Sequence, residues 1–222
     1  MLLWILGCAY KGIPMPGTPR HLSGYVQNIE TSNEQSVAQV SSEINQSTLT
    51  VQDTQIGELV AQSAMSMKGQ STLVVEDQTY RFDCSGFVLA VYAQSGQLIE
   101  GNTRSLFAQS KSSKTLFKTR PLPGDVVFFD NTYDRNRNRK LDDELTHIGI
   151  VTSVSEDDTV YIMHLGGSGV TAITMNLTHP NEHRSPEGVL WNSYLRVNKS
   201  GENSPRLAGQ LFVSYGRLWS MR

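Results

Sequence analysis

The stretch Phe82-Asp83-Cys84-Ser85-Gly86-Phe87-Val88 organises the interpretation of the whole chain. Apolar residues recur after it at the spacing of one helix face, so it predicts a helix that begins at or near Cys84. Free N–H groups and the positive dipole at a helix N-terminus stabilise a thiolate, which is the reactive form of cysteine. Cys84 is therefore a candidate nucleophile. The alternative is a small buried hydrophobic residue without a chemical role.

The length and composition favour one folded domain with an appended segment. The chain has 222 residues, of which 38% are hydrophobic and 18% are charged. A net charge of −2 and the lack of a block of basic residues give no electrostatic reason to expect a nucleic-acid partner. The sequence has no run of about 18 apolar residues, so no transmembrane helix is expected.

The first 52 residues predict an anchor followed by a tether. Residues 1–8 end in Ile5-Leu6-Gly7-Cys8, which resembles a bacterial lipobox whose cysteine is lipidated after signal cleavage. No basic residue precedes the apolar segment, which is shorter than the usual stretch of about 7–15 residues, so an ordinary N-terminal segment is the alternative. Residues 9–52 are rich in polar residues and proline, which predicts a flexible tether. A lipid on Cys8 would attach the protein to a membrane of the bacterial cell envelope.

The folded domain is predicted to span residues 53–222 and to belong to the α+β class, with N-terminal helices packed on a central antiparallel sheet. A helix capped by Asp53 or Thr54 opens it, with its apolar face at Ile56, Leu59, Val60, Ala64 and Met67. A hairpin and two helices, beginning near Cys84 and Thr103, follow. The tail at 206–219 is predicted to form a closing helix. Strands are predicted at 126–129, 146–154, 160–165, 170–175 and 189–197.

Two histidines are placed to complete a cysteine-based site. His147 opens one predicted strand, and His164 occupies the equivalent place in the next. If the two strands pair as a hairpin, the imidazoles are neighbours, and the small Gly149 lies on the same face. His147 would then act as the base for the thiol while His164 orients its ring. The alternative is that each histidine is an ordinary strand residue.

Four stretches, in this order, resemble the motif set of the NlpC-type cell-wall cysteine peptidases, which have a papain-like core and are related to the CHAP amidases. The stretches are residues 82–88, 122–129, 146–151 and 162–164. The resemblance implies that Cys84 is the nucleophile, His147 the base and His164 the orienting residue. Asp83 and Ser85 flank the nucleophile in the matching motif, and the Ser85 backbone N–H is a candidate oxyanion donor by position.

One departure concerns a tyrosine. Many members of the family carry a Tyr-x-Trp-Gly-Gly-like stretch about a dozen residues before the cysteine, and its tyrosine contributes to the site. This chain has Ser71-Thr72-Leu73-Val74 there, and Tyr80 is the nearest tyrosine. Either Tyr80 substitutes from another backbone position or the contact is absent.

The resemblance implies a peptidoglycan hydrolase, a cysteine endopeptidase that cleaves peptide stems through an acyl-enzyme and requires no cofactor. Amidase or acyltransferase chemistry on the same core is the second interpretation, because the acyl-enzyme is common to all three reactions. A non-catalytic, envelope-tethered binding module is the third.

A charged loop at 130–145 is inserted in the predicted domain and has partial calcium-loop spacing. Oxygen side chains stand at positions 1, 3, 5 and 9 of an EF-hand-like loop, with a backbone carbonyl at position 7. These residues are Asp134, Asn136, Asn138, Asp142 and, for the carbonyl, Lys140. Arg139 and Leu145 replace the usual glycine and glutamate, although Asp143 or Glu144 could supply a carboxylate. The loop therefore predicts either a structural Ca²⁺ site or a solvated charged loop.

Overall fold

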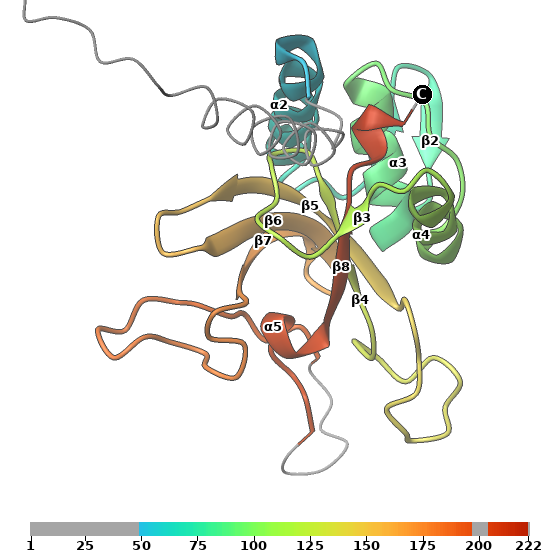
Figure 1. The fold of residues 1–222 in the computed structure, drawn as a ribbon. Coiled ribbons are helices and arrows are strands. Elements are labelled where there is room, and N and C mark those ends of the chain that lie inside the picture. Colours follow the sequence, from blue (N-terminus) through green and yellow to red (C-terminus); the bar gives the residue numbers. More distant parts are fainter. Residues whose placement is uncertain (1–48, 197–203, 222) are drawn as a thin grey trace, which may run out of the picture. The chain divides into compact units, whose positions relative to one another are not determined.

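The computed structural model describes residues 49–196 and 204–221 (Figure 1). Helical elements dominate the first part of the described chain and strands the second, a segregation that is typical of α+β folds. The helices are α2 (Val51–Ser66), α3 (Cys84–Gln94), α4 (Thr103–Ser112), α5 (Ala208–Leu211) and the 3₁₀ turn η1 (Leu218–Ser220). The strands are β1 (Leu73–Val75), β2 (Gln78–Tyr80), β3 (Leu116–Phe117), β4 (Val126–Phe129), β5 (His147–Val154), β6 (Thr159–Gly166), β7 (Gly169–Asn176) and β8 (Phe212–Gly216).

The main sheet has six strands in the order β3-β8-β4-β5-β6-β7, and every neighbouring pair is antiparallel. Strands β1 and β2 form a separate hairpin. The predicted α+β class with a central antiparallel sheet is thus confirmed.

Both faces of the main sheet are covered. Figure 1 shows α2, α3 and α4 gathered to one side of the sheet and α5 on the other side. Strand β4 makes the arrangement clear, because its successive side chains point to opposite faces. Val126 and Phe128 pack in the cluster that holds the buried residues of α3, whereas Val127 and Phe129 pack in the cluster that holds Ala208 of α5.

Helix α2 begins two residues before the predicted start of the domain. Thr50 is its N-cap, and Asp53 completes a capping box as the third helical residue instead of being the cap itself. Val60, Ala64 and Met67 are buried as predicted, but Leu59 is 51% exposed. Residues 50–52, predicted as the end of the tether, therefore belong to the helix and its cap, and Leu49 packs against the core. The predictions for residues 1–48, including the lipobox at Cys8, lie outside the described residues.

Two predictions for the C-terminal part were wrong. Residues 189–196 form no strand in the described chain and make only isolated bridges, such as Arg184 with Leu190. The predicted closing helix is one short turn, α5, followed by β8 in the gap between β3 and β4. Aromatic and β-branched residues at 212–215 suit a strand, and β8 satisfies backbone groups of both neighbouring strands. The helical spacing of Leu207, Leu211 and Tyr215 was misleading.

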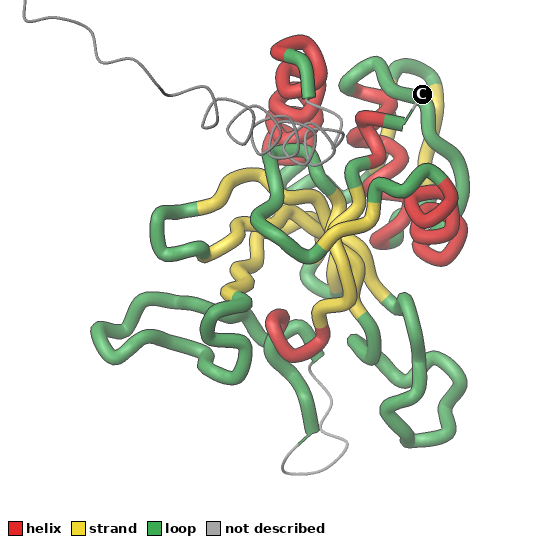
Figure 2. The backbone as a smooth tube through the Cα atoms, viewed as in Figure 1, coloured by secondary structure: helices red, strands yellow, loops and turns green. Residues whose placement is uncertain are grey.

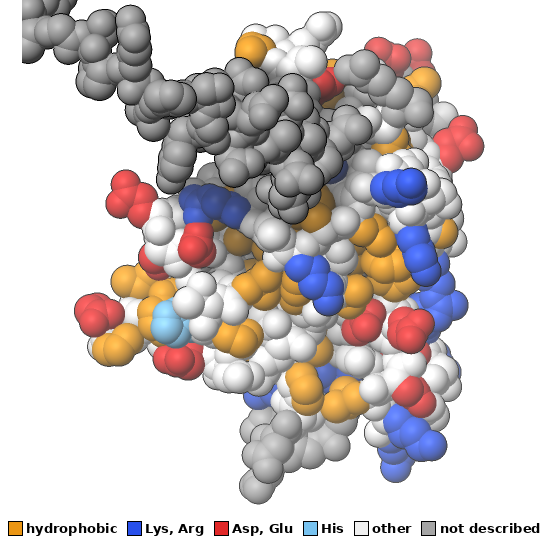
Figure 3. All heavy atoms as spheres, in the orientation of Figure 1, with side chains coloured by type: hydrophobic (Ala, Val, Ile, Leu, Met, Phe, Trp, Pro, Cys, Tyr) orange, Lys and Arg blue, Asp and Glu red, His pale blue; other side chains and the backbone are white. Residues whose placement is uncertain are grey.

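Long loops follow β4 and β7 (Figure 2). On the face drawn in Figure 3, acidic and basic side chains are interspersed, so no field of one sign dominates that face. Within the described ranges, no helix has both the length and the apolar character needed to cross a membrane.

Candidate active site

Cys84 is the first residue of α3, as predicted. The N-cap is Asp83, whose Oδ1 accepts hydrogen bonds from the Gly86 N–H at 2.8 Å and from the Ser85 hydroxyl at 2.9 Å. Burial raises the pKa of Asp83, but the bonds from Gly86 and Ser85 and the charge of Arg81 outweigh it, so the pKa lies below its ordinary value. An ionised carboxylate therefore caps the helix that carries the nucleophile.

The approach of the chain to this helix depends on Gly86. A Cβ atom at this position would lie 1.9 Å from the backbone oxygen of Arg81, closer than any real contact. The segment before α3 thus crosses directly over the first turn of the helix. This close crossing fixes the backbone at the start of α3, and with it the direction in which the Cys84 side chain points.

The Cys84 sulfur lies among groups that favour its ionised form, yet the pKa of the thiol is raised. Burial is the largest cause, and the charge of Asp83 adds to it. The Thr103 hydroxyl and the backbone N–H groups of Ile148 and Ser85 lower the pKa but do not outweigh burial. The resting site therefore holds a thiol, whereas the helix N-terminus alone favoured a thiolate. A base is needed to remove the proton.

The two histidines meet as the sequence predicted. Nε2 of His147 on β5 and Nδ1 of His164 on β6 are 2.7 Å apart, and the rings lie edge to face at 84°. Burial lowers the pKa of His147 to about 3, with a further contribution from His164, and burial lowers the pKa of His164 to about 4. Both rings are therefore neutral near pH 7. When His147 donates from Nε2, its Nδ1 is unprotonated and can accept a proton.

Two glycines allow the histidine pair to form. Strands β5 and β6 pair with Ile150 opposite Met163, which brings His164 beside Gly149. A Cβ atom at Gly149 would lie 3.3 Å from Cβ of His164 and 3.1 Å from the backbone oxygen of Met163. A Cβ atom at Gly166 would lie 2.9 Å from Cε1 of the same imidazole. Larger residues at either position would displace the ring that orients His147.

The nucleophile and the base come from packed elements. Helix α3 packs against β5, and the Ile148 backbone that interacts with the sulfur directly follows His147. No hydrogen bond joins Cys84 and His147 in the described part of the chain. Such bonds are often long in an empty active site and tighten when substrate binds.

The buried histidines make a prediction for stability. Their folded pKa values of about 3 and about 4 lie below the unfolded value of about 6.5, so below that pH the unfolded chain binds more protons. We expect the urea midpoint of unfolding to fall as the pH is lowered from 6.5 to 4.5. The double variant His147→Gln, His164→Gln cannot titrate at these positions and should show a shallower fall. Equal slopes for the two proteins would contradict the assignment.

Tyr80 was predicted to contribute to the site around Cys84, but it lines a groove beside the other end of α3. It lines a groove of about 660 Å³ together with Leu89 and Ala93 from the C-terminal half of α3 and with Ile99. Cys84 lies at the other end of that helix. A substrate contact by Tyr80 remains a prediction.

Thr103 is the residue near the sulfur that sequence reasoning missed. It was predicted only as a helix start, and the structure confirms that α4 begins there. Its Oγ1 lies 3.9 Å from the Cys84 Sγ. The approach of α4 to α3 brings together segments that are distant in the sequence, and no local pattern near Thr103 indicates it.

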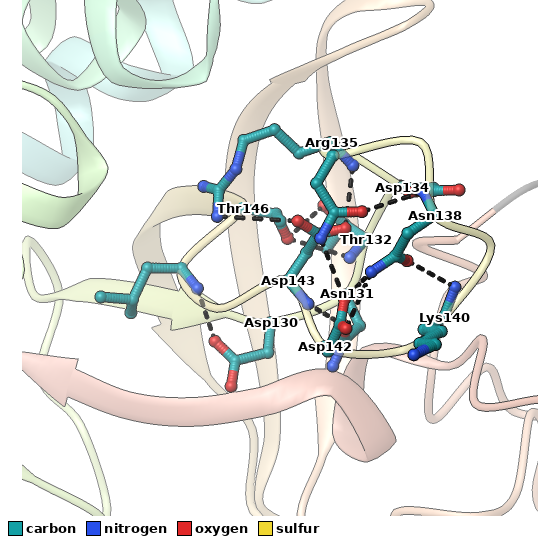
Figure 4. Close-up of polar contacts among 12 residues, drawn as sticks. Asp130, Asn131, Thr132, Asp134, Arg135, Asn138, Lys140, Asp142, Asp143 and Thr146 are labelled. Carbon is teal, nitrogen blue, oxygen red and sulfur yellow. Dashed lines mark hydrogen bonds and ion pairs between the residues drawn. The ribbon is translucent and has the colours of Figure 1, made fainter.

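The inserted loop is held by its own polar groups (Figure 4). Asp134 accepts from the backbone N–H groups of Asn138 and Arg139, and the Asn136 and Asn138 amides donate to Asp142. The Lys140 N–H donates to Oδ1 of Asn138. The base of the loop is closed separately, since the Leu145 N–H donates to Asp130 at 2.6 Å and so positions the start of β5.

The loop offers calcium the right kind of donor but few carboxylates. Asp143 is 2% exposed. Its carboxylate accepts a hydrogen bond from the Arg135 N–H and faces the Arg135 guanidinium, so it already has partners within the protein. Arg139 adopts φ +63°, the left-handed region that glycine favours. No group of three or more His, Cys, Asp or Glu residues is arranged to hold a metal ion in the described ranges. Binding of Ca²⁺ by Asp134, Asn136, Asn138, Lys140 and Asp142 stays a prediction made from their spacing.

Thermal unfolding with and without calcium tests this prediction. If the loop binds Ca²⁺ in the folded state only, calcium at about 100 times its Kd stabilises the protein by about 2.7 kcal/mol, and a chelator removes the gain. The variant Asp134→Asn, Asp142→Asn should not respond. A wild-type melting temperature that is the same in calcium and in chelator would leave the solvated loop as the correct interpretation.

Comparison with known protein families gives one match. The family model of the NlpC/P60 family matches residues 63–186, a range that includes Cys84, His147 and His164. No curated protein and no solved structure matches the chain. The matched range covers more than half of the sequence and most of the structural elements that carry the site. The chain belongs to the NlpC/P60 family, whose members are typically cell-wall peptidases.

Proposed function

We propose that this protein is a cysteine endopeptidase that cleaves the peptide stems of peptidoglycan. The single observation that carries the proposal is the bond of 2.7 Å between His147 and His164, beside a cysteine that begins a buried helix. A neutral imidazole held by a second polar group is the arrangement that a thiol needs when its own pKa is raised. Membership of the NlpC/P60 family supports a peptidoglycan-derived substrate.

The residues act in sequence. The Cys84 proton passes to Nδ1 of His147 as the sulfur attacks the scissile carbonyl carbon, and the carbonyl oxygen takes the negative charge. The Ser85 N–H, which in the resting site favours negative charge on the sulfur, would stabilise that oxygen. His147 then gives its proton to the leaving amine, and a thioester joins Cys84 to the acyl group. Water, deprotonated by His147, hydrolyses the thioester and restores the thiol.

The role of His164 follows from its contact with the base. Its bond to Nε2 keeps the ring of His147 in one orientation and one tautomer throughout the cycle. The same bond stabilises the imidazolium that forms after the proton leaves the sulfur. His164 is a positioning residue in this proposal.

Two other functions fit the same residues. An amidase or an acyltransferase would share the acyl-enzyme and differ in the bond cleaved or in the acceptor. A binding module of the envelope would form no acyl-enzyme. The thioester is thus the species that separates enzymes from a binding protein.

Rapid acid quenching of the protein with purified stem peptides, followed by intact-protein mass spectrometry, tests the proposal. Wild-type protein should gain the mass of an acyl fragment, which hydroxylamine removes because it cleaves a thioester. Cys84→Ala should gain no mass. An unmodified wild-type protein together with unchanged peptides would contradict the peptidase and favour the binding module.

We also propose that a lipid on Cys8 attaches the enzyme to a membrane of the cell envelope. The proposal rests on the Ile5-Leu6-Gly7-Cys8 sequence alone. The N-terminal peptide of protein expressed in a bacterial host should carry a lipid mass on Cys8, and Cys8→Ser should move the protein to the soluble fraction. An unmodified Cys8 peptide from the full chain would contradict attachment at this residue.

A further inference from the structure

The surroundings of the Cys84 sulfur contain one side-chain donor that the mechanism above does not use. In the described part of the chain, Thr103 is the only residue whose side chain forms a hydrogen bond with this sulfur, at 3.9 Å. Its side chain is buried, with 7% of the residue exposed. A hydroxyl in such a place has few other partners, so its contact with the sulfur is the feature to explain.

The position of Thr103 is fixed by the start of α4. Asn102 caps this helix, and its Oδ1 accepts from the N–H groups of Arg104 at 3.0 Å and Ser105 at 3.2 Å. The Ser105 hydroxyl accepts from the Asn102 N–H at 2.7 Å, which completes a reciprocal cap. Thr103 is thus the first residue of a well-defined helix, and the cap fixes the position of its backbone.

Two helices therefore begin at the sulfur. Cys84 is the first residue of α3, and Thr103 is the first residue of α4. The positive dipole ends of both helices favour negative charge in the space between them. That space is where the proton leaves the thiol and where charge first develops.

The charged groups around the sulfur show why a donor matters there. The carboxylate of Asp83 opposes a thiolate, although its ion pair with Arg81 reduces that effect. His147 and its partner His164 are neutral at rest because both are buried. Among the side chains that the structure describes, the Thr103 hydroxyl is the one that favours the anion.

We propose that Thr103 is a catalytic residue, whose hydroxyl donates a hydrogen bond to the Cys84 sulfur as the thiolate forms. This inference rests on the proposed function only in taking Cys84 as the nucleophile. The thiol proton goes to Nδ1 of His147, while the hydroxyl keeps its own proton and no bond to oxygen breaks. The contact of 3.9 Å shortens when the sulfur becomes an anion, because a charged acceptor attracts the donor more strongly.

Alkylation of the folded protein by iodoacetamide between pH 6 and pH 11, followed by mass spectrometry of the Cys84 peptide so that Cys8 does not contribute, tests the proposal without any peptidoglycan. Thr103→Val removes the hydroxyl and keeps the shape, and Thr103→Ser keeps the hydroxyl. We expect valine to raise the apparent pKa of the reaction and to slow it at pH 7.5 by about tenfold, the lower end of what one hydrogen bond to a charged group contributes. Serine should restore the rate to within about threefold of wild type, since its hydroxyl can make the same bond.

Each outcome decides the proposal. Circular dichroism identifies a variant that does not fold. If Thr103→Val does not fold, Thr103→Ala takes its place in the same assay. If the alkylation rate of the valine or alanine variant depends on pH in the same way as that of the wild type, the role of Thr103 is overturned. A shifted profile that serine does not restore would indicate a packing effect and would also overturn it. Failure of the protein to cleave peptidoglycan leaves this assay unaffected, so the two proposals fail separately.

Discussion

His147→Gln is expected to lower kcat on peptidoglycan stem peptides by about 10³-fold, within the range of about 10²–10⁴ that a general acid–base residue contributes. Glutamine keeps a polar side chain but cannot accept the thiol proton, so the nucleophile stays protonated. The raised pKa of Cys84 makes this loss large, because few thiols ionise without help near pH 7. KM should change little, since the substitution removes proton transfer and not a substrate contact.

Two control variants sharpen this test. His164→Gln should lower kcat less, by about 10–100-fold, because amide groups can still orient His147 but do not reproduce the imidazole geometry. His179→Gln changes a histidine whose side chain is 38% exposed and that pairs with Glu182 on the surface, so kcat should stay within about twofold of wild type. A His147→Gln enzyme with near-normal kcat would remove His147 from the mechanism.

Arg217→Met is expected to lower the free energy of unfolding by about 3–5 kcal/mol, the usual effect of leaving one partner of a buried ion pair alone. Asp125 is fully buried, and both of its oxygens accept from Arg217, at 2.9 Å each. Burial raises the pKa of Asp125 above its ordinary value, and Arg217 opposes this rise only in part, so the ionised carboxylate depends on this partner. The pair joins the start of β4 to the end of β8.

Urea unfolding measures this effect. Arg120→Met is the matched control, because it removes the same side chain from an exposed pair with Asp158 and should change the stability by less than about 1 kcal/mol. The double variant Asp125→Leu, Arg217→Met should recover part of the loss, since no charge is left unpaired. Equal losses in the two single variants would show that Arg217 contributes no more than a surface arginine.

The parts of the site that the sequence predicted are those fixed by local spacing. A helix start at Cys84 follows from the apolar pattern after a polar turn, and Asp83 is a common N-cap residue. The sequence also predicted that His147 and His164 meet, because their strands can pair as a hairpin and Gly149 leaves space on the shared face. The structure confirms both the hairpin and the contact between the two rings. Strand and helix periodicities carry this kind of information.

The parts that were missed depend on contacts between distant segments. Arg217 and Asp125 are far apart along the chain, and nothing in the local pattern near either residue indicates the other. Strand β8 was predicted as a helix because the spacing of its apolar residues fits both a helix and a strand. The strand is favoured only by the unpaired edges of β3 and β4, between which it lies. Thr103 was missed for the same reason, since its role appears only when α4 is placed beside α3.

Digestion of purified peptidoglycan by the wild-type protein and by Cys84→Ala, with products identified by mass spectrometry, tests the central claim most directly. The mechanism predicts new free amino groups within the peptide stems for the wild type and none for Cys84→Ala. Release of whole stems from the glycan would instead identify an amidase. Identical products from both proteins would contradict cleavage by Cys84.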